Sequence, residues 1–177
     1  MSIQSFVDYL SLEKNYAAHT IAAYRKDLDD FQSYISVDFS DDNLAEVNYA
    51  QIRSWIIRLV DSGLSNRSIN RKTSSLNSYY KFLIKTGDIT HSPLAKHKAL
   101  KVQKKVHIPF SEQEIETVLS TAATHDFEAM RNKLIVELFY STGIRRSELI
   151  NLKLNDVDFE QNQIKVLGKR NKERFIP

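Results

Sequence analysis

Two short stretches near the end of the chain carry side chains that could act on a phosphate group. Residues 142–149 read Thr-Gly-Ile-Arg-Arg-Ser-Glu-Leu, and Gly168-Lys169 follows some twenty residues later. Arg145 comes after a glycine that can end one helix, and it lies where the next helix begins. Its guanidinium and the free helix N–H groups there could bind a phosphate. Lys169 lies in a predicted turn, where its ammonium could donate a proton to a leaving oxygen.

Glu148 is placed to support the arginine. It follows Arg145 by three residues, so on a helix it can orient Arg145 or Arg146 from the same face. An exposed Arg-x-x-Glu pair is common and adds roughly a few tenths of a kcal/mol. Lysines are equally common in turns. Neither stretch identifies a site when it is taken alone.

Positive charge is concentrated in residues 62–110, which we call the basic block. The block holds ten lysines and arginines against one acid, Asp88, whereas residues 1–61 hold five against ten acids. A solvated helix face usually mixes the two signs, and a field of one sign attracts polyanions. The charge distribution therefore favours binding to nucleic acid.

The elements that must position these residues are mostly helical. Apolar residues at helical spacing predict helices containing Ile3–Leu10, Ile21–Ile35, Ile52–Leu59 and Ile69–Leu83. Asn48 with Gln51 predicts a capping pair for the third helix, which Gly63 ends, and Ser65 or Ser68 caps the fourth, which Gly87 closes. Four amphipathic helices in about 87 residues indicate a compact helical domain.

A second domain is expected after a connector at residues 88–110, with its boundary near 106–110. Ser111 and Glu114 form a capping-box pattern at the start of its first helix. A helix from about Glu128 to Thr142, capped by Gly143, precedes a short helix from Arg145 to Leu152. We expect three short strands after it, around Val157 and Phe159, around Ile164 and Val166, and around Phe175 and Ile176. In the longer helix the residues expected to face inward are Leu134, Ile135, Leu138, Phe139 and Tyr140.

Several other kinds of site find no support. The chain has no cysteine, its five histidines lack a His-x-x-x-His spacing, and no Walker or Gly-x-Gly-x-x-Gly motif occurs. Asp156 and Asp158 alternate and could hold a cation, although such a pair at a strand edge is more often structural. We therefore expect no metal and no nucleotide cofactor. No signal peptide is visible, and no apolar stretch approaches the roughly 20 residues of a membrane span.

Taken together, these features resemble the tyrosine recombinases of the phage integrase family, especially its bacterial Xer-like members. Five stretches carry the resemblance: Thr20–Leu28, which is similar to the family's Thr-x-x-x-Tyr-x-x-Asp-Leu helix; Ser65–Leu83, its fourth helix; Ile108–Glu114, the entry to its catalytic domain; Tyr140–Leu149, its first arginine box; and Val166–Arg174, its lysine hairpin. The family usually has glycine where Arg170 stands, a departure that leaves Lys169 in place.

The resemblance implies a mainly α fold in three parts. Residues 1–90 would form a four-helix, SAM-like core-binding domain, and residues 91–107 a basic linker. Residues 108–177 would form the first, α+β part of a catalytic domain, with a small three-stranded antiparallel sheet.

The resemblance also implies roles for individual residues. Arg145 would contact the scissile phosphate, Lys169 would be the candidate proton donor, and Glu148 would support the arginine. Tyr140 lies within the predicted helix that comes before Arg145, so we expect a core residue there and not the nucleophile. The residues expected to bind DNA are Arg67, Arg71, Lys72, Lys96, Lys98, Lys101, Lys104 and Lys105.

The implied activity is site-specific cleavage and rejoining of duplex DNA through a 3′-phosphotyrosyl intermediate, without metal or ATP. The family's His-x-x-Arg box and nucleophilic tyrosine would lie after residue 177, so we expect these residues to bind DNA without cleaving it. A full-length protein would act as a homo- or hetero-tetramer on synapsed DNA, in the cytoplasm of a bacterium and associated with the nucleoid. The alternative is a non-catalytic helical DNA-binding regulator or decoy.

Overall fold

In the computed structural model the chain divides into two compact units, Met1–Lys104 and Lys105–Pro177. The residues that the structure describes are 2–40, 43–104, 106, 108–121, 126–168 and 172–177.

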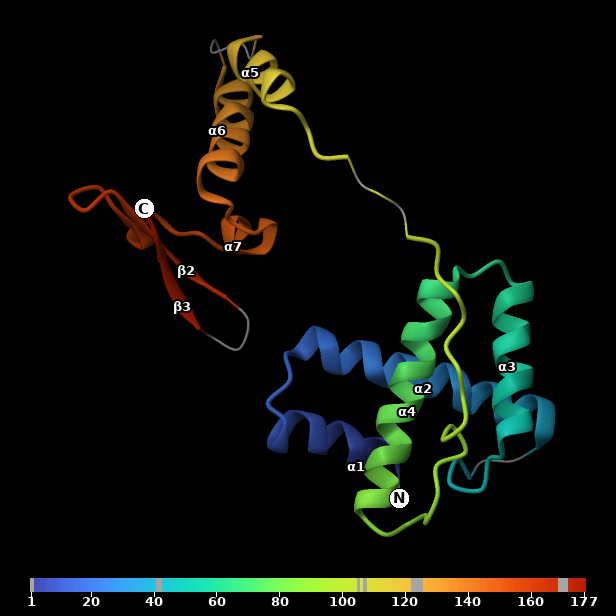
Figure 1. Ribbon diagram of the computed structural model, residues 1–177. Helices are drawn as coiled ribbons and strands as arrows, with labels where there is room; N and C mark the ends of the chain where they lie inside the picture. The colour runs from blue at the N-terminus through green and yellow to red at the C-terminus, as the bar shows by residue number, and fades with distance from the viewer. Residues whose placement is uncertain (1, 41–42, 105, 107, 122–125, 169–171) are drawn as a thin grey trace. The chain divides into compact units, whose positions relative to one another are not determined.

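The first unit contains the four predicted helices (Figure 1). They are α1 (Ile3–Asp8, continued by the π-helical turn η1, Tyr9–Glu13), α2 (Ala18–Phe39), α3 (Tyr49–Asp61) and α4 (Asn66–Lys85). The predicted capping box at the start of α3 is present, because the Asn48 side chain accepts the Gln51 N–H and the Gln51 side chain accepts the Asn48 N–H. Of the two serines considered for α4, Ser65 is the cap.

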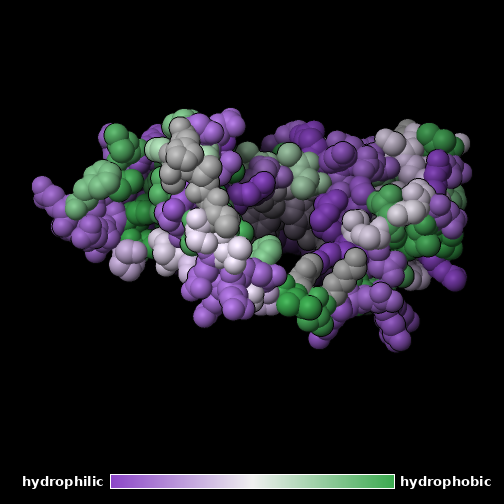
Figure 2. Space-filling model, turned by 90° about the horizontal axis from the view of Figure 1, so that it is seen from above, coloured by the Kyte–Doolittle hydropathy of each residue, from purple (hydrophilic) through white to green (hydrophobic). Residues whose placement is uncertain are grey.

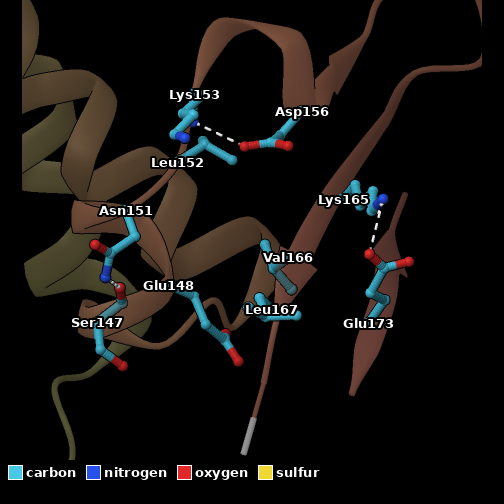
Figure 3. A pocket seen from close by; sticks show the side chains of 10 residues that line it. All are labelled: Ser147, Glu148, Asn151, Leu152, Lys153, Asp156, Lys165, Val166, Leu167 and Glu173. Atoms are coloured by element: carbon cyan, nitrogen blue, oxygen red, sulfur yellow. Dashed lines mark hydrogen bonds and ion pairs between the residues drawn. The ribbon is translucent and has the colours of Figure 1, made fainter. Parts of the chain in front are cut away.

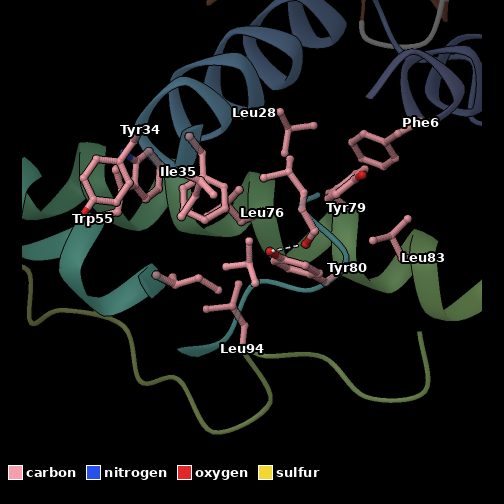
Figure 4. Close-up of a cluster of buried hydrophobic side chains, with 14 of the residues drawn as sticks. Phe6, Leu28, Tyr34, Ile35, Trp55, Leu76, Tyr79, Tyr80, Leu83 and Leu94 are labelled. Atoms are coloured by element: carbon pink, nitrogen blue, oxygen red, sulfur yellow. Dashed lines mark hydrogen bonds between the residues drawn. The ribbon is translucent and has the colours of Figure 1, made fainter. Parts of the chain in front are cut away.

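The core of this unit lies between α1, α2, α3 and α4 (Figure 4). Apolar side chains recur every three or four residues and so form one stripe along each helix. These stripes face one another and exclude water from the space between the helices. Aromatic and aliphatic side chains both contribute to this core, and Phe31 packs against Trp55 with ring centroids 4.9 Å apart. The side chains with almost no exposed surface are Phe6, Leu28, Phe31, Ile35, Ile52, Ile69, Leu76, Tyr80 and Leu83.

An ion cluster joins α2 to α4 beside this core. The Asp27 carboxylate is buried, and it accepts hydrogen bonds from Arg71 at 2.5 and 2.8 Å, from Ser75 at 2.7 Å and from Lys72 at 3.2 Å. Lys72 also donates to Asp30 at 2.7 Å. Burial raises the pKa of Asp27, but the hydrogen bonds from Arg71, Ser75 and Lys72 outweigh burial and leave the pKa below its ordinary value.

The beginning of the expected linker packs on this helical unit. Leu94 is buried in the core, and the Asn70 side chain bonds both main-chain groups of Leu100, at 2.9 Å to its N–H and 2.8 Å to its carbonyl. Asn66 donates to the Lys101 carbonyl at 2.8 Å. The segment through residue 101 is therefore anchored along α4. The division into residues 1–90, 91–107 and 108–177 stays a prediction.

The second unit begins with three helices. They are α5 (Glu112–Thr121), α6 (Phe127–Thr142) and α7 (Arg146–Ile150). The predicted Ser111–Glu114 capping box opens α5, since the Ser111 N–H donates to Glu114 and the Glu114 N–H donates to Ser111. Gly143 closes α6 in the left-handed conformation, with φ of 59°, as its position after the helix predicted.

A three-stranded antiparallel sheet follows in the order β1-β2-β3, which confirms the predicted strands. A 3-10 turn, η2 (Leu154–Asp156), leads into β1 (Val157–Asp158), β2 (Gln163–Leu167) and β3 (Glu173–Ile176). Ile164 pairs with Ile176, and Val166 pairs with Arg174. These four residues share one face because side chains on a strand alternate. The buried core of this unit is small and consists of Ile144, Val166 and Ile176.

The expectation for the inward face of α6 is wrong for three of its five residues. Leu134, Phe139 and Tyr140 are exposed, with Tyr140 at 52% of its surface, whereas Ile135 is half-buried and Leu138 packs against the small core. Apolar residues lie on several sides of α6, so their spacing does not select one face. Exposed apolar side chains of this kind interrupt the polar surface in Figure 2.

No helix among the described residues is long and apolar enough to span a membrane.

Replacing Asp27 by Asn tests the ion cluster. The amide keeps the shape of the carboxylate but leaves Arg71 and Lys72 without their buried negative partner. We expect the free energy of unfolding of the first unit to fall by about 3 kcal/mol at pH 7. Urea unfolding followed by the fluorescence of Trp55, the single tryptophan, measures this. The control Asp29→Asn alters an exposed carboxylate of the same helix and should change stability by less than about 0.5 kcal/mol. Equal stability of Asp27→Asn and the unchanged chain would contradict the role of the cluster.

Candidate functional site

The turn between α6 and α7 places Arg145 at the surface. The Gly143 N–H donates to the Phe139 carbonyl at 3.1 Å, and Ile144 then inserts into the small core. Arg145 follows in an extended conformation, with φ of −75° and ψ of 147°, as the residue that caps α7. Its side chain is 61% exposed. A buried residue before it and a helix after it fix the backbone from which the guanidinium projects.

Glu148 anchors this arginine from inside the molecule. Its side chain is only 2% exposed, and both oxygens accept hydrogen bonds: Oε1 from Arg145 Nη1 at 2.8 Å, and Oε2 from the Arg145 main-chain N–H at 2.9 Å. In Figure 3, Glu148 extends from α7 toward Val166 and Leu167 of β2. The main-chain bond also satisfies one of the N–H groups that every helix start leaves free.

The hydrogen bonds change the acidity of this carboxyl group. The Arg145 main-chain N–H is the largest influence on the pKa of Glu148 and lowers it, burial raises it, and the side chains of Arg145 and Arg174 also lower it. Together these influences bring the pKa from 4.5 to about 2. The folded state stabilises the ionised form of Glu148 relative to the unfolded state. Glu148 therefore contributes its full stabilisation above about pH 4.5. That contribution is lost as the pH falls from about 4.5 to about 2.

Arg174 also belongs to this site. It lies in the Val166–Arg174 stretch, but the sequence predicted no role for it. Its Nη2 donates to Glu148 Oε2 at 2.8 Å, and its side chain is 41% exposed. A signal for it was available in the alternation of β3. Ile176 points inward, so Arg174, two residues earlier, lies on the same face. A charged residue on an inward face needs a charged partner.

Lys169, the predicted proton donor, lies outside the described residues. The residues that flank the undescribed segment are described. The Gly168 N–H, just after β2, donates to the Lys172 carbonyl, just before β3, at 2.7 Å. A Cβ on Gly168 would lie 3.3 Å from that carbonyl and 3.7 Å from Glu148 Oε1. The base of the β2–β3 connection is therefore close to the Glu148 carboxylate.

A shallow cavity of about 450 Å³, with Glu148 in its lining, lies between α7 and β2 (Figure 3). Charges of both signs line it, and Lys165 pairs with Glu173 at 2.9 Å. Asp156 accepts the Lys153 N–H at 3.0 Å, and Asp158 accepts the N–H groups of Glu160 and Gln161. These two aspartates cap turns, and no cluster of three potential metal ligands occurs in the described part of the chain.

The basic residues of α4 differ in how available they are. Arg67 is exposed, and Arg71 is 53% exposed although its guanidinium is held by Asp27. Lys72 is only 11% exposed and its ammonium is bound to Asp27 and Asp30. The structure thus places Lys72 in an internal ion pair, although a DNA contact was predicted for it.

The lysines predicted to bind DNA after α4 are exposed, except Lys105, which lies outside the described residues. The exposed ones are Lys96, Lys98, Lys101 and Lys104.

Two sequence families match nearly the whole chain. Residues 3–87 match the family described as "Phage integrase, N-terminal SAM-like domain", and residues 109–177 match the "Phage integrase family".

Curated relatives agree with these matches. The chain is 34% identical over 175 residues to "Tyrosine recombinase XerC" of Staphylococcus haemolyticus, covering 98% of this chain and 58% of the relative. It is 34% identical over 176 residues to the protein of the same name from Anoxybacillus flavithermus, covering 99% of this chain and 58% of that one. The chain therefore spans less than two thirds of the length of these relatives.

Solved structures share the fold. A lambda integrase dimer bound to a COC' core site is similar with a TM-score of 0.73 and 19% identity, over 99% of this chain and 60% of that one. The Tn1549 transposon integrase in complex with circular intermediate DNA is similar with a TM-score of 0.68 and 20% identity, over 100% of this chain and 60% of that one. At such identities the likeness concerns the fold alone.

The titration of Glu148 tests the anchor. We expect its carboxyl carbon to titrate with a midpoint near pH 2 in an NMR experiment, because three donors stabilise the ionised form. Arg145→Gln removes the side-chain donor and should raise that midpoint. Lys133→Gln, on α6, removes a positive charge elsewhere in the unit and should leave the midpoint in place. A midpoint near 4.5 in the unchanged chain would show that the anchor does not form.

Proposed function

The chain belongs to the phage integrase family of tyrosine recombinases, and on that basis we propose that it binds duplex DNA and acts in site-specific recombination. The observation that supports this most directly is the exposed Arg145 guanidinium, fixed on the buried Glu148 carboxylate at the start of α7. A guanidinium held in one orientation is suited to bind a phosphodiester through two of its N–H groups.

We assign the chemical roles as follows. Arg145 contacts the scissile phosphate and stabilises the charge that builds on its non-bridging oxygens. Glu148 positions Arg145 without touching the DNA. Lys169 delivers a proton to the 5′ oxygen as the phosphorus–oxygen bond breaks. In the whole protein a tyrosine would attack the phosphorus and retain the 3′ phosphate, so that rejoining needs neither metal nor nucleotide.

The basic block supplies most of the affinity in this proposal. Arg67 and the exposed lysines that begin at Lys96 contact backbone phosphates, and their field steers the duplex to the protein. Arg71 contributes its exposed edge. Lys72 contributes through the fold, because its ammonium already binds Asp27 and Asp30.

We propose that these 177 residues bind DNA without cleaving it. Tyr140 is the one tyrosine after Tyr80, and it comes before Arg145, whereas the family's nucleophile follows that arginine. The whole protein would assemble as a tetramer on two synapsed duplexes, and DNA binding would keep it with the bacterial nucleoid.

Binding to a short duplex at several salt concentrations tests the first part of the proposal. We expect about four to seven phosphate contacts, so the plot of log affinity against log salt should have a slope of about −4 to −6. Arg67→Glu should weaken binding and make the slope shallower by about 1. Fluorescence anisotropy of a labelled duplex measures both quantities.

Arg53→Glu is the matched control, since it makes the same charge change at an exposed position of α3 outside the basic block. It should affect binding much less than Arg67→Glu. Absence of duplex binding at low salt would refute the proposed function, and equal effects of the two substitutions would refute the role of the basic block.

Incubation with a nicked duplex that traps covalent complexes tests the second part. We expect no protein–DNA adduct that survives denaturing electrophoresis, because the chain presents no tyrosine in the nucleophile's place. Tyr140→Phe should behave in the same way. An adduct formed by the unchanged chain and lost in Tyr140→Phe would make Tyr140 the nucleophile and overturn this part of the proposal.

A further inference from the structure

The Glu148 carboxylate holds two arginines, not one. Arg145 Nη1 lies 2.8 Å from Oε1, and Arg174 Nη2 lies 2.8 Å from Oε2. The two oxygens of one carboxylate are about 2.2 Å apart, which standard bond lengths dictate, so the two bound nitrogens cannot be more than about 8 Å apart. A helix start and a strand thus bring two guanidiniums to one point.

Each arginine keeps most of its donors for another partner. A guanidinium carries five N–H groups, and the described contacts use one Nη of each side chain. The Arg145 side chain is 61% exposed and the Arg174 side chain 41%, whereas Glu148 is almost fully covered. The negative partner is therefore on the inner side, and the unused donors of both arginines are open to solvent.

The two guanidiniums and the Glu148 carboxylate together carry a net charge of +1. A phosphodiester carries −1, so one phosphodiester would neutralise them. The backbone under Arg174 is fixed as well, because Arg174 pairs with the buried Val166 and is followed two residues later by the buried Ile176. Both arginines are thus held in place before any ligand arrives, which reduces the entropy lost on binding.

We propose that Arg174 is a second phosphate-binding arginine, which Glu148 holds beside Arg145 so that both guanidiniums donate to the same DNA phosphodiester. This inference rests on the proposed function, and it adds a residue to that site. Two planar donors on one phosphate fix its orientation as well as its position. Glu148 acts as the positioning residue for both.

NMR of the arginine Nε–Hε groups during titration with a short duplex tests the proposal. We expect the resonances of Arg145 and Arg174 to shift together and to give one dissociation constant. Arg174→Gln should weaken binding roughly tenfold at low salt and make the salt slope shallower by about 1, because one phosphate contact is lost. Arg174→Lys keeps the charge but replaces the planar guanidinium by an ammonium, so it should restore the slope and part of the affinity.

Two controls separate a binding role from a structural one. Arg131→Gln removes the same charge from an exposed arginine on α6 and should change the affinity less than twofold. Amide exchange of β2 in each variant reports whether the sheet stays folded. If Arg174→Gln opens the sheet, the Arg174 resonance of the unchanged chain decides, since a structural role alone would leave that resonance unmoved by DNA.

The outcomes distinguish the two levels of the argument. If the Arg145 resonance moves with duplex and that of Arg174 does not, the second arginine is refuted and the proposed function stands. A slope that Arg174→Gln leaves unaltered in a folded protein refutes it as well. If neither resonance moves and anisotropy detects no binding, the proposed function fails and this inference fails with it.

Discussion

A buried carboxylate must be surrounded by donors, and that requirement at Glu148 organises the second unit. Removing an ionised group from water is costly unless hydrogen bonds replace the lost solvation. Glu148 meets this condition through the Arg145 main chain, the Arg145 side chain and Arg174. The same three bonds cap α7, orient an exposed guanidinium and attach β3. The proposed phosphate site therefore depends on one side chain that no ligand would touch.

The first unit uses the same physical device for a different purpose. Asp27 is buried beside the core, and its donors Arg71, Lys72 and Ser75 all come from α4. Part of the positive charge of the basic block is thus used to attach α4 to α2. Lys72 is held completely in this way, whereas Arg71 is held and still half exposed. Charge counted along the sequence therefore overstates the charge that is available to a polyanion.

The sequence predicted the elements well wherever the signal was local. The capping boxes at Asn48 and Ser111 and the left-handed Gly143 depend on residues only a few positions apart, and the structure confirms them. The support of Arg145 by Glu148 was visible for the same reason. The contacts of Arg174 and Asp27 were not predicted, since their partners lie 26 and 44 residues away along the chain. The inward face predicted for α6 was wrong for Leu134, Phe139 and Tyr140, because apolar residues lie on several sides of that helix and their spacing does not select one face.

The two kinds of positive charge in this chain respond differently to salt, and this difference separates affinity from geometry. Exposed lysines such as Lys96 and Lys101 act through a field that ions screen within about 10 Å at 0.1 M. The bonds to Glu148 are short and their acceptor is covered, so salt screens them far less. In the proposed function, rising salt would therefore release DNA from the protein without changing the orientation of Arg145. Weak binding to the DNA backbone allows a protein to search for its target sequence. A preset arginine then aligns a single phosphate once the target is found.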